Sequence, residues 1–320
     1  MASGLRVFSG SAHPGLARAI CRKLGILPGA ARIHRFANDN IKVKVEENVR
    51  AADVFVVQPS CPPVADGLVE VLVFIDALKH ASANRVTAVL PYYPYVRSDK
   101  KDEPRISITA RLVADLLQTA GADRVLVVDL HSPQAQGFFH VPCDHLTAIE
   151  LLCDHFGETP ERRADLVVVA ADIGEAKDAG RFAKRLGCPM AVIDKRRFGD
   201  DSTVKAVNLI GEVNGKRALV VDDEVATAGT LMEAADFLRA HGAREVLCCC
   251  THPVLVGDAV ERIASGVVTR FVCTDTLPIA DEKLARPGFR DKLTVLSVAP
   301  LLAEAISRIH DGRSVSDLFR

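Results

Sequence analysis

Two adjacent carboxylates followed by a turn of small residues form the stretch best suited to chemistry. Asp222 and Asp223 follow the apolar run ALVV at 218–221, which is typical of a buried parallel strand. The turn brings backbone N–H groups and two hydroxyls to the start of a helical pattern, and it consists of Ala226, Thr227, Ala228, Gly229 and Thr230. Orphan amides and the helix dipole favour an anion there. Carboxylates for sugar hydroxyls beside a phosphate cradle indicate a ribose phosphate; the alternative is an ordinary turn with a solvent-facing acidic pair.

Polar side chains also end two other predicted strands. Asp129 and His131 lie at the end of a strand over 124–129, and Asp172 ends a strand over 165–170 ahead of a helix. Ligands of open parallel sheets bind at this edge. A neutral imidazole near carboxylates can help hold a divalent metal, whereas the alternative is a buried, hydrogen-bonded histidine.

Two segments are rich in cations. Residues 91–105 hold three prolines, all three tyrosines of the protein, Arg97, Lys100, Lys101 and Arg105. This loop is too long for a plain connector. Its tyrosine rings and Arg97 can stack on a base while the other cations attract phosphates, or the loop is solvated or contacts a subunit. The second segment, KRR at 195–197, predicts a mobile loop rather than a strand, and solvated surface is the alternative.

A hairpin is predicted over 32–36 and 41–45. Its tip contains Asn38, Asp39 and Asn40, residue types that tolerate left-handed backbone and bond locally. A structural turn explains this tip without a ligand.

Alternating strand and helix patterns must position these residues. Further strands are predicted over 5–8, 53–58, 85–90, 190–194, 267–273 and 293–298, and helices over 14–24, 67–82, 106–120, 147–156, 258–264 and 300–309. Aligning Thr109 with Thr230, 121 residues apart, pairs Gly121 with Gly242 and His131 with His252 without a gap. A helix, turn and strand repeated in this way indicate two domains of one α/β architecture.

The bulk composition narrows the function. At 320 residues, two domains are the default. A formal net charge of −1 argues against a general binder of nucleic acid or anionic membranes, and no apolar segment is long enough for a signal peptide or a membrane span. We therefore expect a cytoplasmic protein. The nine cysteines show no CxxC spacing, and Cys248, Cys249 and Cys250 cannot all face one metal from a strand, so buried reduced thiols are expected.

In their order along the chain, these motifs resemble the ribose-phosphate pyrophosphokinase family. The acidic pair and its turn look like the phosphoribosyltransferase fingerprint. The resemblance extends through VFSG at 7–10, ENVR at 47–50, ITARLVADLL at 108–117, VDLHSPQAQGFF at 128–139, ADIG at 171–174, VIDKRR at 192–197, VVDD at 220–223 and LLAEAISRI at 301–309.

The resemblance implies a fold and an activity. It implies two tandem phosphoribosyltransferase-like domains, each a mostly parallel sheet flanked by helices: a nucleotide-contacting domain over 1–146 and a ribose 5-phosphate domain over 147–305, with a helix over 306–320 packing back on the first. The implied reaction transfers the diphosphoryl group of Mg-ATP to the 1-hydroxyl of ribose 5-phosphate and releases AMP. A homo-oligomer with the nucleotide site near a subunit interface is also implied.

Roles carried over by the resemblance cover four groups of residues. Lys195 and Arg197 match the catalytic loop. ATP would meet Phe36, Asn38, Asp39, Asn40, Arg97, Ser98 and Asp99. Mg²⁺ would be held by His131, Asp172, Asp129 and Asp144. Ribose 5-phosphate would meet Asp222 and Asp223 through its hydroxyls and the turn 226–230 through its phosphate.

Some positions depart from the common family pattern. FANDN at 36–40 replaces FSDGE, which leaves the donor nucleotide open, and ATAGT at 226–230 replaces DTGGT. Ser98 stands where Gln is usual, and His140 where Asp often occurs. Alternative functions are therefore a non-catalytic regulatory homologue or a phosphoribosyltransferase that uses a nitrogenous base.

Overall fold

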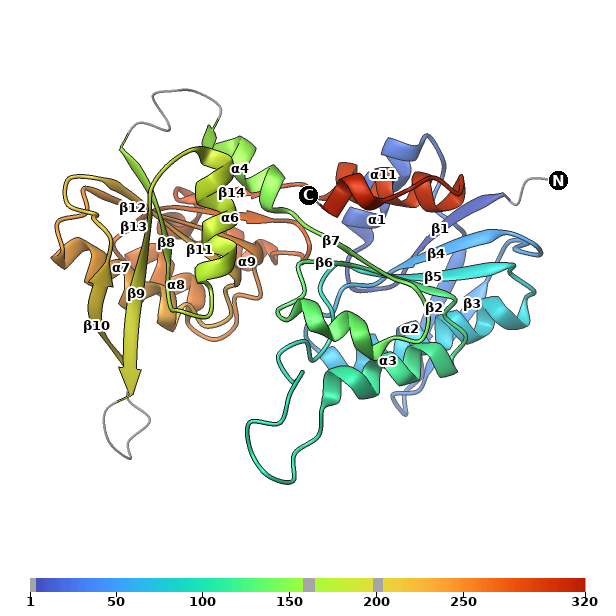
Figure 1. Ribbon diagram of the computed structural model, residues 1–320. Coiled ribbons are helices and arrows are strands. Elements are labelled where there is room, and N and C mark those ends of the chain that lie inside the picture. The colour runs from blue at the N-terminus through green and yellow to red at the C-terminus, as the bar shows by residue number, and fades with distance from the viewer. Residues whose placement is uncertain (1–3, 158–164, 198–203, 320) are drawn as a thin grey trace. The chain divides into compact units, whose positions relative to one another are not determined.

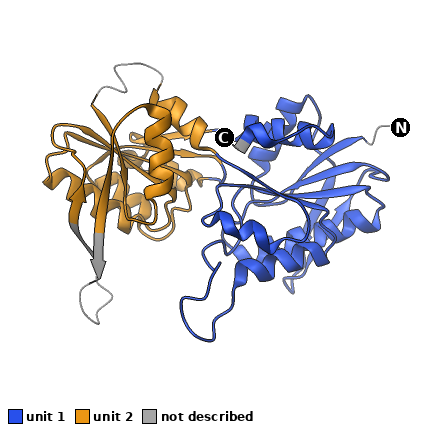
Figure 2. Ribbon diagram, in the orientation of Figure 1, with its two compact units in different colours: residues 1–147, 276–278, 297–320 blue, residues 148–275, 279–296 orange. Residues whose placement is uncertain are grey.

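Two mostly parallel sheets, each covered by helices on both faces, make up the chain, which is described by a computed structural model over residues 4–157, 165–197 and 204–319 (Figure 1). The predicted α/β class is confirmed. The chain divides into unit 1, residues 1–147, 276–278 and 297–320, and unit 2, residues 148–275 and 279–296 (Figure 2).

Unit 1 is built on a five-stranded sheet of order β1-β4-β5-β6-β7, in which all neighbouring strands are parallel. Its strands are β1 (Leu5–Ser9), β4 (Asp53–Val57), β5 (Arg85–Leu90), β6 (Arg124–Val128) and β7 (Cys143–Leu146). Its helices are α1 (Pro14–Leu24), α2 (Val64–His80), α3 (Thr109–Thr119), η1 (Pro133–Phe138), α11 (Ala299–His310) and η2 (Ser316–Phe319). An antiparallel hairpin of β2 (Ala31–Arg35) and β3 (Ile41–Val45) completes it, as predicted.

The central strands of the unit 1 sheet, β4, β5 and β6, are buried on both sides because helices cover both faces. Helices α1 and α11 lie on one face of the sheet, and α2 and α3 lie on the other (Figure 1). In β4, all five residues are buried. Continuous apolar runs of this kind are what a parallel sheet between two helix layers requires.

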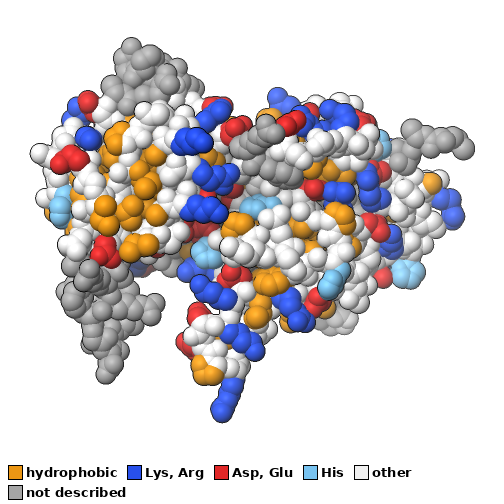
Figure 3. Space-filling view, viewed as in Figure 1, with side chains coloured by type: hydrophobic (Ala, Val, Ile, Leu, Met, Phe, Trp, Pro, Cys, Tyr) orange, Lys and Arg blue, Asp and Glu red, His pale blue; other side chains and the backbone are white. Residues whose placement is uncertain are grey.

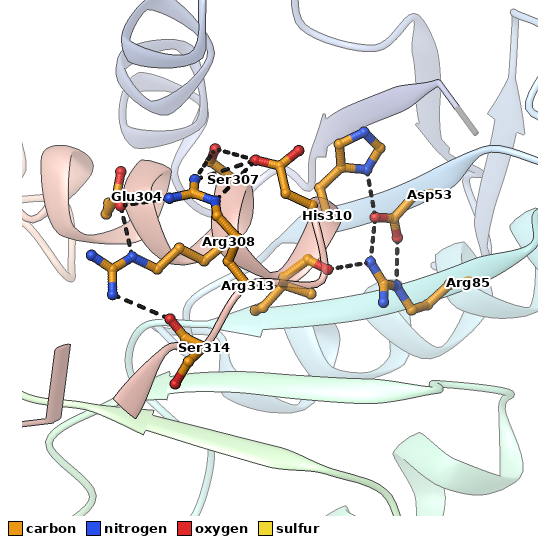
Figure 4. A network of polar contacts seen from close by, with 10 residues as sticks. Asp53, Arg85, Glu304, Ser307, Arg308, His310, Arg313 and Ser314 are labelled. Carbon is orange, nitrogen blue, oxygen red and sulfur yellow. Dashed lines mark hydrogen bonds and ion pairs between the residues drawn. The ribbon is translucent and has the colours of Figure 1, made fainter. Parts of the chain in front are cut away.

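Helix α11 packs on α1 with buried apolar side chains. It is also joined to unit 1 by a polar network (Figure 4). The guanidinium of Arg85 donates to both carboxylate oxygens of Asp53 and to the carbonyl of Ile309. Nδ1 of His310 lies 2.8 Å from Oδ2 of Asp53, whose side chain is 2% exposed. The last turn of α11 is thereby tied to β4 and β5.

Unit 2 is built on a seven-stranded sheet of order β10-β9-β8-β11-β12-β13-β14. Only the outer pair β9 and β10 is antiparallel among its described strands. The strands are β8 (Leu166–Ala170), β9 (Met190–Arg197), β10 (Val204–Ile210), β11 (Arg217–Glu224), β12 (Glu245–His252), β13 (Val268–Thr274) and β14 (Leu293–Leu296). The helices are α4 (Ile149–Gly157), α6 (Ala176–Leu186), α7 (Gly229–Ala240), α8 (Ala259–Ser265), α9 (Asp281–Leu284) and α10 (Pro287–Arg290).

Alternating residues of the unit 2 strands enter two separate cores. Cys248 and Cys250 pack with α7 and α8, whereas Cys249 packs with α4 and α6. All three are buried free thiols, as predicted, and burial raises the pKa of each well above its usual value.

The internal repeat corresponds to real elements. Helix α3 and strand β6 of unit 1 match α7 and β12 of unit 2 at the offset of 121 residues, and each helix connects two neighbouring parallel strands. The copies differ before the helix: residues 91–108 separate β5 from α3, whereas four residues, 225–228, separate β11 from α7.

The prediction of a loop at 195–197 was wrong. Lys195, Arg196 and Arg197 belong to β9, where they pair with Ala206, Lys205 and Val204 of β10. Charged residues have a low intrinsic strand preference, but ladder hydrogen bonds to a partner strand override it. Strand β10 had not been predicted, and residues 198–203 of the expected loop lie outside the described part of the chain.

Candidate active site

The acidic pair lies at the carboxyl end of the central strand of unit 2. Strand β11 extends through Glu224, so both aspartates belong to the strand itself. Oxygen atoms of Asp222, Asp223 and Glu175 all lie within 4.8 Å of one another. Three carboxylates at this distance can hold a divalent cation, because hard cations prefer oxygen ligands.

Asp222 is held in an unfavourable place for a charge. Burial raises the pKa of its carboxyl well above the usual value, and the neighbouring carboxylate of Asp223 adds to the shift, followed by that of Glu175. Burial disfavours the charged form, and like charges disfavour it further. A cation or a sugar hydroxyl donor would offset this concentration of negative charge.

Glu175 was missed by the sequence analysis, which singled out Asp172 from the same strand-to-helix turn. Oδ1 of Asp172 accepts a hydrogen bond from the backbone N–H of Glu175 at 3.2 Å, immediately before α6. Asp172 therefore shapes the turn that places Glu175 beside the acidic pair. The sequence did offer a signal for Glu175: it is a second carboxylate, three residues after Asp172, in the same turn between a strand and a helix.

The turn at 226–230 is a short, supported connection. The N–H groups of Leu255 and Val256 donate to the carbonyls of Val225 and Ala226, each at 2.9 Å. Ala228 is left-handed, with φ 58° and ψ 10°, and is 4% exposed. Thr227 and Thr230 are exposed, so their hydroxyls are available to a ligand at the N-terminus of α7.

In unit 1, Asp129 and His131 follow β6 directly. Asp129 has a left-handed backbone, with φ 35°, and its N–H donates to the carbonyl of Leu146. His131 is exposed rather than buried in a core. Both residues thus lie at the carboxyl edge of the sheet, where the sequence placed them.

Asp144 lies away from this edge and already has a partner. Its carboxylate is buried and forms an ion pair with Arg124, the first residue of β6. It aligns with Leu126, two residues before the end of that strand. Asp144 is therefore a poorer candidate for a metal ligand than Asp129.

The long loop over 91–108 projects from unit 1 and carries several Lys and Arg side chains on its surface (Figure 1, Figure 3). Arg97, Lys100, Lys101 and Arg105 are exposed, and Asp99 is partly exposed. Tyr93 cannot stack on a base, because it is 2% exposed, its hydroxyl donates to the carbonyl of Ala110, and its ring packs edge-on against Phe139.

Ser98 closes this loop onto α3. Its Oγ donates to the carbonyl of Ser107 and accepts from the N–H of Thr109, and its carbonyl accepts from the N–H of Ala110. The hydroxyl expected to meet ATP therefore also has a structural role.

The hairpin tip at 36–40 is exposed. Phe36 is 45% exposed and packs edge-on against His34, while Asp39 has φ 64°. Oδ1 of Asn38 accepts from the N–H of Asn40 at 3.3 Å. The expected turn is confirmed, and the Phe36 ring is accessible to a planar ligand.

Among the described residues, no helix combines the length and apolar character needed to cross a membrane.

Comparisons with known proteins give a consistent picture. Residues 5–121 match the family model described as the N-terminal domain of ribose phosphate pyrophosphokinase, and residues 201–320 match the phosphoribosyl synthetase-associated domain. A ribose-phosphate pyrophosphokinase of Deinococcus radiodurans is 51% identical over 99% of this chain and 98% of its own, and one from Clostridium acetobutylicum is 44% identical over 99% and 97%. The crystal structure of phosphoribosylpyrophosphate synthetase from Mycobacterium smegmatis superposes with a TM-score of 0.90 at 42% identity, covering 97% of this chain and 100% of that one.

Proposed function

The chain belongs to the ribose-phosphate pyrophosphokinase family, and from this we propose that it transfers the diphosphoryl group of Mg-ATP to the 1-hydroxyl of ribose 5-phosphate. The products are 5-phosphoribosyl 1-pyrophosphate and AMP, which places the enzyme in nucleotide biosynthesis. The observation that carries the proposal is the 51% identity, over 99% of the chain, to an enzyme of that name.

Ribose 5-phosphate binds in unit 2. Asp222 and Asp223 accept hydrogen bonds from the ribose hydroxyls at the end of β11. The N-terminal amides of α7 and the hydroxyls of Thr227 and Thr230 receive the 5-phosphate, since a helix N-terminus with free N–H groups attracts an anion. Together these contacts fix the sugar so that its 1-hydroxyl is oriented for attack.

Mg²⁺ fits the donors that this chain offers. Glu175, Asp222 and Asp223 provide only oxygen ligands, and burial together with the neighbouring carboxylates raises the pKa of Asp222, which a bound cation would offset. Because their oxygen atoms lie within 4.8 Å of one another, these three residues would hold the ion in unit 2. Asp129, His131 and Asp172 are further candidates from the family resemblance. Bound Mg²⁺ neutralises phosphate charge during the transfer.

ATP binds to unit 1 residues in this proposal. The exposed ring of Phe36 packs on the adenine, and Asn38, Asp39 and Asn40 provide donors and acceptors beside it. The exposed Arg97 pairs with phosphate oxygens, and Ser98 and Asp99 complete the site.

Lys195 and Arg197 stabilise the transferred group. Charge spreads over the phosphoryl oxygens in the transition state, so positioned cations lower the barrier more than they strengthen ground-state binding. Their backbone lies in β9, beside the edge strand β10.

The proposal also includes homo-oligomerisation, with the nucleotide site near a subunit interface, and a cytoplasmic location. Both are supported by the family resemblance.

A coupled assay of AMP formation tests the function. With ATP as donor, AMP should form only when ribose 5-phosphate and Mg²⁺ are also present. Replacing ATP with GTP, CTP or UTP, and measuring the corresponding nucleoside monophosphate, gives the nucleotide preference of a chain with the altered tip Asn38 to Asn40. A chain that forms no AMP with any donor would instead be a regulatory homologue. Product formation that requires a free nitrogenous base would indicate a phosphoribosyltransferase.

A further inference from the structure

The proposed phosphate loop is strained at Ala228. This residue has a left-handed backbone, φ 58° and ψ 10°, although it carries a Cβ. The left-handed region costs a residue with a side chain roughly 1–2 kcal/mol. Neighbouring groups must therefore hold the loop in this conformation.

Contacts on both sides of Ala228 support the loop. Before it, the carbonyls of Val225 and Ala226 accept from Leu255 and Val256. After it, the carbonyl of Ala228 accepts from the N–H of Met232 within α7. The carbonyl directly before Ala228, that of Thr227, accepts from a side chain: Nη1 of Arg262, at 3.1 Å.

Arg262 reaches the loop from α8, which packs against α7. A Cβ placed on Gly229 would lie 3.2 Å from Nη1 of Arg262, so the guanidinium lies against the first residue of α7. The absence of a side chain at Gly229 leaves room for this close approach.

The charge of Arg262 is only weakly compensated. Its carboxylate partner, Asp258, is 3.9 Å away, and the two side chains are 45% and 80% exposed for Arg262 and Asp258 respectively. Exposed pairs at this distance contribute little. The positive charge therefore adds to the field of the α7 N-terminus, where an anion is favoured.

We propose that Arg262 is a positioning residue for ribose 5-phosphate: it holds the Thr227 carbonyl, keeps Ala228 left-handed, and supplies a positive charge beside the phosphate. The inference rests on the proposed function and adds a residue to the phosphate site that the motif itself does not contain. It also explains how the loop works with Ala at position 228.

Substitutions of Arg262 test this role through a split between the two substrates. Arg262→Ala should raise the KM for ribose 5-phosphate about 10- to 100-fold, as expected for a lost hydrogen bond that involves a charged group. The KM for ATP should stay within about twofold. Arg262→Lys keeps the charge and one donor, and Arg262→Gln keeps a donor without the charge, so Lys should recover more affinity than Gln.

Arg239→Ala is the matched control. Arg239 also donates from its guanidinium to backbone carbonyls, those of Ala243 and Arg244, but at the C-terminal end of α7. This variant should leave the KM for ribose 5-phosphate within about twofold of wild type.

The outcomes separate the two proposals. A wild-type chain without AMP formation refutes the proposed function. If the wild type is active, an unchanged ribose 5-phosphate KM in Arg262→Ala refutes the role of Arg262, as does an equal rise in both KM values. Circular dichroism and the melting temperature establish that each variant is folded. If Arg262→Ala does not fold, the Lys and Gln variants decide the question by the same split.

Discussion

The carboxylate of Asp53, in the second strand of its sheet, contacts the imidazole of His310, 257 residues further along the chain, at 2.8 Å. The same carboxylate receives two hydrogen bonds from Arg85, which also binds the carbonyl of Ile309 (Figure 4). One buried charge thus joins α11 to the strands of unit 1.

Asp53→Asn should destabilise unit 1 by about 3–5 kcal/mol, because removing one member of a buried ion pair leaves the other charge uncompensated. Chemical denaturation measures this free energy of unfolding. The matched control is Asp76→Asn, which removes an exposed Asp–His pair on α2 and should change stability by less than about 1 kcal/mol. If both variants lose similar free energy of unfolding, the buried Asp53 network contributes no more to stability than an exposed ion pair.

Asp222→Asn should raise thermal stability at neutral pH in the presence of EDTA. The folded pKa of Asp222 is raised, so between the unfolded value near 3.9 and the folded value the native state binds more protons than the unfolded state. Stability therefore falls as pH rises through that interval, and Asn removes this loss.

Melting temperatures from pH 4 to pH 8 measure the effect, at about 2–4 °C for each kcal/mol of relieved repulsion. The gain should shrink as the pH approaches 4. Asp236→Asn, an exposed substitution on α7, should follow the wild-type pH dependence. If the wild type is as stable at pH 8 as at pH 4, or more stable, the expected repulsion at Asp222 is contradicted. The stabilised Asp222→Asn enzyme should lose activity, because the amide replaces one acceptor oxygen with a donor NH2 group and removes the negative charge that faces the ribose hydroxyls.

Glu175→Gln should raise the Mg²⁺ concentration needed for half-maximal activity about tenfold, because one anionic ligand is replaced by a neutral amide. Mg²⁺ should also raise the melting temperature of the wild type more than that of the variant. The control is Asp178→Asn, in the first turn of α6. It removes a carboxylate that pairs with Arg181 and not with the acidic pair, so this variant should behave as wild type. An unchanged Mg²⁺ requirement in Glu175→Gln would exclude this residue from the metal site.

Lys195→Ala should lower kcat about 10²–10³-fold, by analogy with the loss of one oxyanion donor. The Kd for ribose 5-phosphate should change less than about threefold, because the cation acts on the transferred group. Isothermal titration and AMP kinetics give the two quantities. Lys184→Ala, an exposed lysine on α6, is the control. Equal losses in binding and turnover would rule out a transition-state role.

Local sequence pattern predicted most strands and helices of the chain. Runs such as residues 54–57 and 166–170 are apolar throughout because helices cover both faces of their sheets, so a few residues are enough to indicate a buried strand. The repeat was visible because α3 and α7 keep the same spacing to the strands that follow them. Asp222, Asp223 and the turn at 226–230 were found for the same reason, since they directly follow a buried run.

Features that depend on distant partners were missed. Lys195 and Arg197 are in a strand because β10 pairs with them, which no local propensity reveals. Tyr93 is buried, with its hydroxyl bonded to Ala110 and its ring packed against Phe139, although the Lys and Arg side chains of the same loop are exposed. Arg262 contacts the Thr227 carbonyl in the turn at 226–230 across 35 residues of sequence. Each case requires the fold to be known before the neighbour can be named.

The order of elements along the chain has a consequence for synthesis on the ribosome. Unit 1 begins with β1 but receives α11 only after all of unit 2 has been translated. At roughly 5–20 residues per second, the 257 residues between Asp53 and His310 require about 13–51 s. During that interval the face of α1 that α11 covers stays exposed, and Asp53 has Arg85 but not His310 as a partner, so a nascent chain arrested before α11 should be a preferred client of chaperones.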